Sequence, residues 1–121
     1  MNKKKAYVAS HDIDKARKVA EVLDNMGFMI TSRWLENSFN PTDSYTLNQR
    51  IVIATEDVDD VSDSDFLVLI SSDDRVPGGK FVEVGVALGQ GKSVYILGHR
   101  ENMLMYHPKC IQLSKIEDIN E

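Results

Sequence analysis

Short apolar runs alternate with segments of helical period along nearly the whole chain, and this alternation constrains the fold more than any other feature. The runs that we expect to form strands are Lys5–Ser10, Phe28–Trp34, Phe66–Ile70, Ser93–Leu97 and Cys110–Leu113. Strands that alternate with helices predict a mostly parallel sheet with helices on both faces and right-handed crossovers. The sequence therefore predicts an α/β fold, a three-layer sandwich around a mostly parallel five-stranded sheet.

Three segments between these runs have the pattern of helices. Within Asp14–Met26 the apolar residues recur at spacings of three and four. From Tyr45 to about Ser62, one helical stripe contains Leu47, Ile51, Ala54, Val58 and Val61. The valine-rich segment Phe81–Leu88 also fits a hairpin strand. We interpret it as a helix, because Gly85 and Gly89 lie four residues apart, where a helix can press closely on a sheet.

The edge of this sheet where ligands bind is predictable from the fold class. In open parallel sheets, ligands bind at the carboxyl ends of the strands, near the point where the strand order reverses. Three loops should meet there, Ser10–Asp12, Ser71–Gly79 and Gly98–Asn102. The loop Leu35–Ser44 is also long enough to be a candidate for function.

Acidic residues cluster between Glu56 and Asp65, and most of them fit a solvated helix face. We expect Asp59 and Asp60 to be exposed, whereas Asp57 lies beside the helical stripe and Asp65 immediately precedes a predicted strand. The acids lack the spacing of a calcium loop, and the three histidines are scattered among loop residues. Phosphate-loop and dinucleotide fingerprints are also missing. No metal and no cofactor are predicted.

Size and charge limit the possible partners. The 121 residues fit one domain, so we expect residues 1–121 to form a single unit. A net charge of −5 argues against duplex nucleic acid, and apolar runs of five or six residues are far short of the about 20 that span a membrane. With one cysteine and no apolar leader behind Lys3–Lys5, we expect a cytoplasmic protein that binds a small molecule or another protein.

Glu83 is the only polar residue between Phe81 and Leu88. A carboxylate buried without a partner must shift its pKa, find hydrogen-bond donors or take part in chemistry. The dipole at a helix N-terminus would help to keep it ionised, and an ionised carboxylate beside a ligand is suited to be a nucleophile. The alternative is a structural glutamate in a salt bridge. Tyr7 likewise fits either a core tyrosine or a donor to a carboxylate across the strand ends.

The helical interpretation of this segment also predicts a partner subunit. The residues expected to face the sheet are Phe81, Val84, Gly85 and Leu88, which turns Glu83 away from the sheet together with Gly79 and Ala87. The outer face remains apolar through Val82, Val86 and Ala87. A helix that is apolar all round must be covered on more than one side, so we expect a homo-oligomer.

Three stretches of the chain together resemble the nucleoside 2-deoxyribosyltransferase family, which includes the deoxynucleoside monophosphate N-hydrolases. They are KAYVAS with Tyr7, EDVDDVSDSDFLVLI with Asp57 and Asp65, and GGKFVEVGVALGQGKSVYILGHREN. The most specific part is the pattern E-x-G-x-A-L-x-x-G-K-x-V, which begins at Glu83. The resemblance covers nearly the whole chain and implies a flavodoxin-like, Rossmann-like sheet.

The resemblance implies cleavage or transfer at the N-glycosidic bond of a deoxynucleoside or nucleotide through a glutamate, which by its place in the motif is Glu83. It also implies that Tyr7 hydrogen-bonds this glutamate and that Asp57 binds the base and helps to protonate it as it leaves. Asp65 matches the acid that opens the family's central strand. Asn102 matches an asparagine that reaches a sugar hydroxyl in a neighbouring subunit, so the sites would be shared between subunits.

One loop departs from the family pattern. Six residues before the glutamate, where the family has an aspartate or a serine, this chain has Pro77. Asp73, Asp74 or Arg75 would then bind the substrate instead, beside Gly79, whose N–H group can meet an anion. The loop after the first strand also lacks the glycine and arginine cluster that holds phosphate in the monophosphate hydrolases. Transferase, hydrolase and a non-catalytic nucleotide-binding or sensing module on the same fold all stay open, as does an assembly protein.

Overall fold

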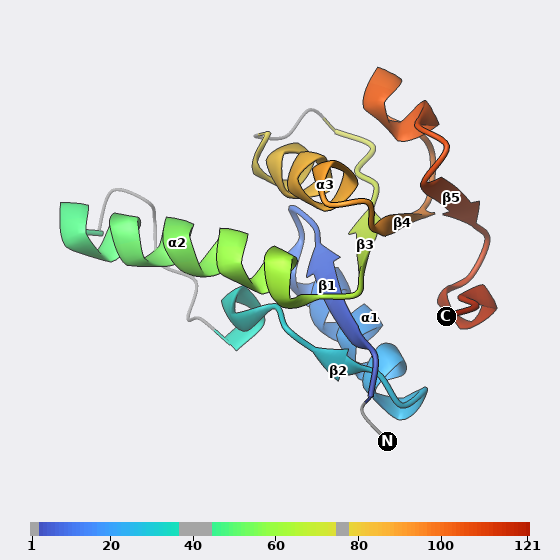
Figure 1. Cartoon of the computed structure of the whole chain (residues 1–121), viewed down its shortest axis with the longest axis horizontal. Helices are drawn as coiled ribbons and strands as arrows, with labels where there is room; N and C mark the ends of the chain where they lie inside the picture. The colour runs from blue at the N-terminus through green and yellow to red at the C-terminus, as the bar shows by residue number, and fades with distance from the viewer. Residues whose placement is uncertain (1–2, 37–44, 75–77) are drawn as a thin grey trace.

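The computed structural model of the chain describes residues 3–36, 45–74 and 78–121. These residues form an all-parallel five-stranded sheet in the order β2-β1-β3-β4-β5 (Figure 1). The strands are β1 (Lys5–Ala9), β2 (Met29–Ile30), β3 (Phe66–Ile70), β4 (Ser93–Leu97) and β5 (Cys110–Leu113). The predicted α/β fold with a five-stranded parallel sheet is confirmed.

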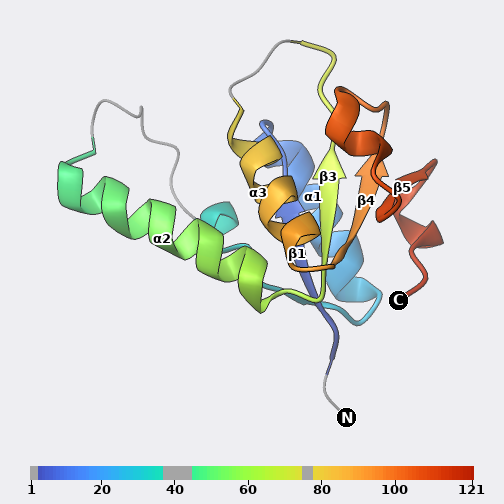
Figure 2. The same ribbon diagram turned by 45° about the horizontal axis from the view of Figure 1, so that its top comes forward.

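Helices cover both faces of the sheet (Figure 2). Helix α1 (Ile13–Asn25) packs on one face, and α3 (Gly79–Gly89) with the end of α2 (Leu47–Asp63) packs on the other. Alternate residues of β1 and β3 point to the two layers, so all five residues of β3 are buried. A continuous apolar run is typical of such a central strand. Every helix in the described part of the chain is too short or too polar to cross a membrane.

Side-chain caps determine where α1 and α2 begin. The Asp12 side chain accepts hydrogen bonds from the main-chain N–H groups of Asp14 and Lys15, at 3.0 and 3.1 Å. Thr46 and Gln49 form a capping box at the start of α2. These caps satisfy N–H groups that have no partner within the helix. The chain therefore turns into α1 soon after β1 ends, which leaves a short loop at the carboxyl edge of the sheet.

The second strand is shorter than predicted. Of the expected strand Phe28–Trp34, only β2 pairs with β1, and the chain then winds into the short 3-10 helix η1 (Arg33–Glu36). In η1 the main-chain N–H of Arg33 donates to Asp60 Oδ2 at 3.0 Å. A side-chain acceptor from α2 thus satisfies a backbone donor that a longer strand would have paired in the sheet.

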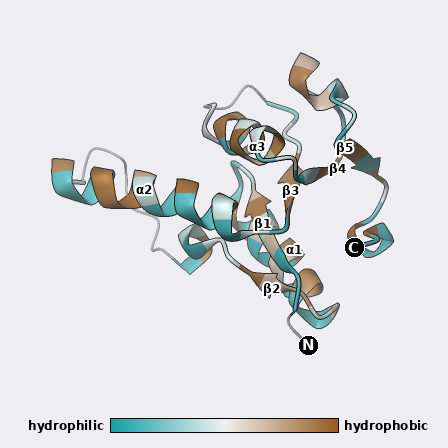
Figure 3. Cartoon of the chain, in the orientation of Figure 1, coloured by the Kyte–Doolittle hydropathy of each residue, from teal (hydrophilic) through white to brown (hydrophobic). Residues whose placement is uncertain are grey.

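Helix α2 projects from the body of the molecule, and its N-terminal turns lie away from the sheet (Figures 1 and 3). The predicted apolar stripe is therefore buried at one end only. Val61 is fully buried, whereas Leu47, Ile51 and Val58 are 73%, 54% and 45% exposed. The helical period correctly indicates which residues share a face, but it contains no information about what covers that face.

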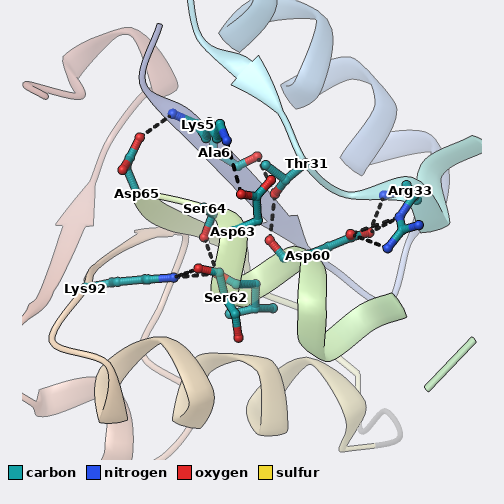
Figure 4. Close-up of polar contacts among 11 residues, drawn as sticks. Lys5, Ala6, Thr31, Arg33, Asp60, Ser62, Asp63, Ser64, Asp65 and Lys92 are labelled. Atoms are coloured by element: carbon teal, nitrogen blue, oxygen red, sulfur yellow. Dashed lines mark hydrogen bonds and ion pairs between the residues drawn. The ribbon is translucent and has the colours of Figure 1, made fainter. Parts of the chain in front are cut away.

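Polar contacts hold the C-terminal end of α2 in place (Figure 4). Lys92 Nζ donates to the carbonyl oxygens of Val61 and Ser62, each at 2.7 Å, which is a favourable place for a cation. Asp60 Oδ1 lies 2.9 Å from the Arg33 Nη2 atom. The prediction that Asp60 is solvated is wrong, because η1 brings Arg33 against it and leaves the residue 6% exposed.

Gly98 allows β3 and β4 to end side by side. Its φ of 113° is in the region that favours glycine, and a Cβ atom at this position would lie 2.8 Å from the Cβ of Ser71. Ser71 follows β3 and Gly98 follows β4, so this close approach brings the two loops out at the same edge of the sheet.

Candidate active site

A cavity of about 220 Å³ opens at the carboxyl edge of the sheet, beside the start of α3. Its walls come from β1 and the loop after it, from η1, from α2 and from α3. The lining residues of this first cavity are Tyr7, Ser10, His11, Trp34, Asp57, Gly79, Lys80 and Glu83. Four of the predicted site residues, Tyr7, Asp57, Gly79 and Glu83, are thus brought together from three elements.

Tyr7 and Glu83 form the central contact of the first cavity. Tyr7 is fully buried in the middle of β1, and its hydroxyl donates a hydrogen bond to Glu83 Oε2. The alternation of β1 points Tyr7 to the layer that contains α3, and Glu83 lies in the second turn of that helix. The hydrogen bond therefore holds the carboxyl group against the wall of the cavity.

The orientation of α3 differs from the prediction. The buried residues of this helix are Lys80, Val84 and Ala87. Gly85, which we expected against the sheet, is exposed, and outside its own stretch of helix backbone no atom lies within 4 Å of the place its Cβ would take. Glu83 points toward Tyr7 of β1, and not away from the sheet. A helix that is apolar nearly all round gives no sequence signal for its rotation, and here the Tyr7 hydroxyl provides a polar partner on the sheet side.

Burial controls the ionisation of the two acids in the first cavity. It raises the pKa of Glu83 to about 7, against the hydrogen bond from Tyr7, which lowers it, and the charge of Asp57 raises it further. Burial also raises the pKa of Asp57 to about 6, helped by the charge of Asp60. The pKa of Tyr7 is raised by burial and by Glu83, so its hydroxyl remains a donor. We expected the helix end to keep Glu83 ionised, but near pH 7 both of its forms are populated.

A second cavity, of about 340 Å³, lies on the other side of the start of α3. Its lining residues are Ser72, Asp73, Asp74, Phe81, His99, Glu101 and Asn102. The predicted substrate-binding residues Asp73, Asp74 and Asn102 line this second cavity, so they are separated from Glu83, which lines the first. The Asn102 side chain accepts the N–H of Leu104 at 3.0 Å and caps the 3-10 helix η3 (Met103–Tyr106). Among the described residues, no three His, Cys, Asp or Glu side chains are grouped as metal ligands would be.

Asp65 lies at the opposite end of the sheet from both cavities. It immediately precedes β3, and its Oδ2 atom accepts the main-chain N–H of Lys5 at 2.7 Å (Figure 4). This bond joins the amino ends of β1 and β3, so Asp65 is not brought together with the other predicted site residues. Pro77 and Arg75, which belong to the loop that departs from the family pattern, lie outside the described residues.

The first cavity is also lined by side chains that the sequence analysis does not predict as site residues. Lys80 is the clearest example, because its partner is Glu101, 21 residues away, and no local pattern reveals such a pair. Ser10 and His11 belong to the loop that we expected at this edge. Trp34 both supports the core and lines the cavity, since its indole N–H donates to a carbonyl oxygen of β1 at 2.9 Å.

Comparison with protein families gives a match over most of the chain. The family model described as nucleoside 2-deoxyribosyltransferase matches residues 6–114. A search of curated protein sequences finds no match.

Solved structures share the fold at low sequence identity. A 2-deoxyribosyltransferase from Bacillus psychrosaccharolyticus has a TM-score of 0.73 at 20% identity, over 94% of this chain and 88% of that one. A conserved protein from Enterococcus faecalis V583 has a TM-score of 0.62 at 21% identity, over 83% and 66% of the two chains. The CMP N-glycosidase of Clostridium botulinum has a TM-score of 0.59 at 18% identity, over 94% and 92%.

Proposed function

The chain belongs to the nucleoside 2-deoxyribosyltransferase family, and we propose that its first cavity is an active site in which Glu83 is the attacking carboxylate. Members of this family transfer or cleave at the N-glycosidic bond of nucleosides or nucleotides. The single observation that supports the role of Glu83 is its buried hydrogen bond with Tyr7 inside the cavity. A non-catalytic nucleotide-binding module is not favoured by the family match.

The proposed reaction has two steps. Ionised Glu83 attacks C1′ of the sugar while the bond from C1′ to the base nitrogen breaks, and the bonding electron pair leaves with the base. Positive charge builds on the sugar in the transition state, and the carboxylate stabilises it. Tyr7 keeps the carboxylate oriented throughout. Water or a second base then attacks C1′ of the ester and gives its proton to the Asp57 carboxylate, while the bond from C1′ to the Glu83 oxygen breaks and releases the Glu83 carboxylate.

Asp57 is the group that we propose for binding and protonating the leaving base. It lines the first cavity, and burial raises its pKa to about 6, so part of the population carries a proton near neutral pH. A positioned acid of this kind typically contributes about 10²- to 10⁴-fold to the rate. The contacts of Lys92 and Arg33 hold the adjoining end of α2, which fixes the position of Asp57 in the cavity wall.

Apart from Asp65, which lies at the far end of the sheet, the other predicted residues are proposed to bind the substrate from the rim. Gly79 begins α3, where main-chain N–H groups have no partner within the helix and can bind an oxygen atom. Asp73 and Asp74 lie in the second cavity with Asn102. The proposed use of Asn102 in a neighbour's site requires a homo-oligomer.

Exposed apolar side chains near the site support an oligomer of this chain. Val82 on α3 and Met103 in η3 are 64% and 82% exposed. We propose that both side chains belong to an interface between copies of the chain, because exposed apolar patches mark interaction surfaces. Sedimentation of the active protein tests this proposal, and a stable monomer with full activity would contradict it.

The proposed function is tested with the four natural 2′-deoxynucleosides and their 5′-monophosphates, each with and without a second free base. Chromatography of the products should show release of free base, and a new nucleoside when a second base accepts the sugar. Glu83→Gln serves as the matched control, because it keeps the shape of the side chain and removes its charge. Absence of both products from the parent protein would reject the proposal.

A further inference from the structure

A buried ion pair joins α3 to the loop after β4, beside the proposed active site. Lys80 Nζ lies 2.7 Å from Glu101 Oε2, and the two side chains are 2% and 10% exposed. Lys80 lies in the first turn of α3 and lines the first cavity, whereas Glu101 lines the second. The pair therefore lies between the two cavities.

Stability alone does not account for this pair. The desolvation of two charges offsets much of their attraction, and replacing a buried ion pair by apolar residues is often neutral or stabilising. Lys80 shares the buried side of α3 with Val84 and Ala87, where an apolar side chain would pack as well. The position of the pair between the two cavities is suited to a role in their electrostatics.

Negative charges dominate the walls of the two cavities. Asp57 and Glu83 line the first, while Asp73, Asp74 and Glu101 line the second. Among the described residues of both walls, Lys80 is the one lysine or arginine, and Glu101 already neutralises its charge. A phosphate group that enters here meets several carboxylates and a cation that is already paired.

The proposed reaction also implies an orientation for a bound nucleoside. Asp57 and Trp34, from α2 and η1, form the wall that suits a base, since a carboxyl group can pair with ring nitrogens and an indole offers an aromatic face. With C1′ at Glu83 and the base at this wall, we expect the 5′ end of the sugar on the side of the first cavity away from the base. Lys80 also lines this cavity, one helical turn before Glu83, and its ammonium group is paired with Glu101.

We propose that Glu101 is a specificity-determining residue, which holds Lys80 in a neutral pair and so makes the site accept a free 5′-hydroxyl and discriminate against a 5′-phosphate. This inference rests on the proposed function of the first cavity. The Glu101 carboxylate has acceptor capacity left for a hydroxyl, whereas a phosphate must compete with it for the same ammonium group. The neutral pair also keeps uncompensated positive charge away from the cationic sugar of the transition state.

The test compares kcat/KM for each 2′-deoxynucleoside with that for its own 5′-monophosphate. We expect the parent to prefer the nucleoside. Glu101→Gln keeps the shape of the side chain and frees the charge of Lys80, so it should shift the ratio toward the monophosphate by about 10- to 100-fold, the effect of one hydrogen bond to a charged group. Glu117→Gln, which neutralises an exposed acid in the 3-10 helix η4 (Ile116–Asp118), is the matched control and should leave the ratio unchanged.

A parent protein that prefers the monophosphate, or an unchanged ratio in Glu101→Gln, would overturn the inference. If Glu101→Gln does not fold, a double variant with Lys80→Met and Glu101→Met takes its place, and it should retain the nucleoside preference because it has no cation to offer. Preference of the double variant for the monophosphate would also overturn the inference. Failure of the parent to release any base would reject the proposed function instead. Thermal melting with the same ligands then tests the inference separately, since the nucleoside should raise Tm more than its monophosphate does.

Discussion

Two carboxyl groups of the same helical layer, Asp60 at the end of α2 and Glu83 near the start of α3, have partners of different charge. Asp60 accepts hydrogen bonds from the guanidinium group and the main-chain N–H of Arg33, at 2.9 and 3.0 Å. Glu83 accepts a hydrogen bond from the neutral hydroxyl of Tyr7, and burial raises its pKa to about 7. Asp60 joins two elements of the fold, whereas Glu83 faces a cavity. Asp60, which is paired with a cation and joins two elements, is thus part of the framework, whereas Glu83, which has a neutral donor and faces a cavity, is available for chemistry.

The largest expected effect is on catalysis at Glu83. We expect Glu83→Gln to lose several orders of magnitude in turnover, roughly 4 to 8 kcal/mol of barrier, because the attacking charge is removed. Turnover and thermal melting should be measured together. A folded variant that turns over at the parent rate would show that Glu83 is not catalytic. Glu83 and Asp60 would then both be structural.

The free energy of unfolding of Glu83→Gln, compared with that of the parent, should change with pH in a defined direction. Because the pKa of Glu83 is raised from its ordinary 4.5 to about 7, its contribution to stability is fully present below about pH 4.5 and is lost as the pH rises through about 7. The parent should therefore lose stability relative to Glu83→Gln over this range. Urea unfolding of both proteins at pH 5 and pH 8 measures the difference, and parallel values at the two pH values would argue against a buried, raised-pKa carboxyl group.

Asp57→Asn should have the next largest effect. Loss of a positioned acid is expected to lower kcat/KM by about 10²- to 10⁴-fold, with little change in the free energy of unfolding. Asp59→Asn is the matched control, because Asp59 is an exposed acid two residues away on the same helix. Equal losses in both variants would indicate a general effect of negative charge rather than a site at Asp57.

Asp60→Asn should affect stability before chemistry. The variant weakens the hydrogen bonds to Arg33 that join η1 to α2, and we expect it to lower the free energy of unfolding by about 1 to 3 kcal/mol. Chemical denaturation measures this loss, again with Asp59→Asn as the control. A variant as stable as the parent would show that the ion pair contributes little to the framework.

Tyr7→Phe should have the smallest effect, seen as a shift in pH dependence. The hydrogen bond from Tyr7 lowers the pKa of Glu83, so its removal should raise that pKa further. Ionised Glu83 then becomes available only at higher pH, and the variant should lose more activity at pH 6 than at pH 8. A uniform loss across this range would indicate that Tyr7 orients the carboxylate without changing its charge.

The sequence predicts well those elements whose structure depends on neighbouring residues along the chain. The run Phe66–Ile70 is apolar throughout because both faces of β3 are covered, and the pattern of α1 continues to its end. Local patterns predict too long a strand over Phe28–Trp34, because the formation of η1 depends on Asp60, an acceptor far along the chain. The exposed turns of α2 and the rotation of α3 also depend on neighbours that no local pattern describes.

The candidate site divides in the same way. Glu83 stands out locally as a lone carboxyl group in an apolar segment, and Tyr7 was assigned to it through the family resemblance. Asp65 matches the same resemblance, yet it lies at the far end of the sheet, because a strand separates its two ends by about 3.3 Å per residue. No local pattern indicates Lys80, because its ion pair needs Glu101, which approaches it only through the order of β3 and β4 in the sheet.

The close approach of Gly98 to Ser71 has a consequence for how this fold can diversify. Gly98 and Ser71 hold the carboxyl ends of β3 and β4 in close contact, so the loops that follow these strands begin from fixed positions. Loop sequences beyond Ser71 and Gly98 can then be exchanged or lengthened without moving the strands or the Tyr7 hydroxyl behind them. A library built on this chain to change substrate range should vary those loops and leave Gly98 and Ser71 untouched.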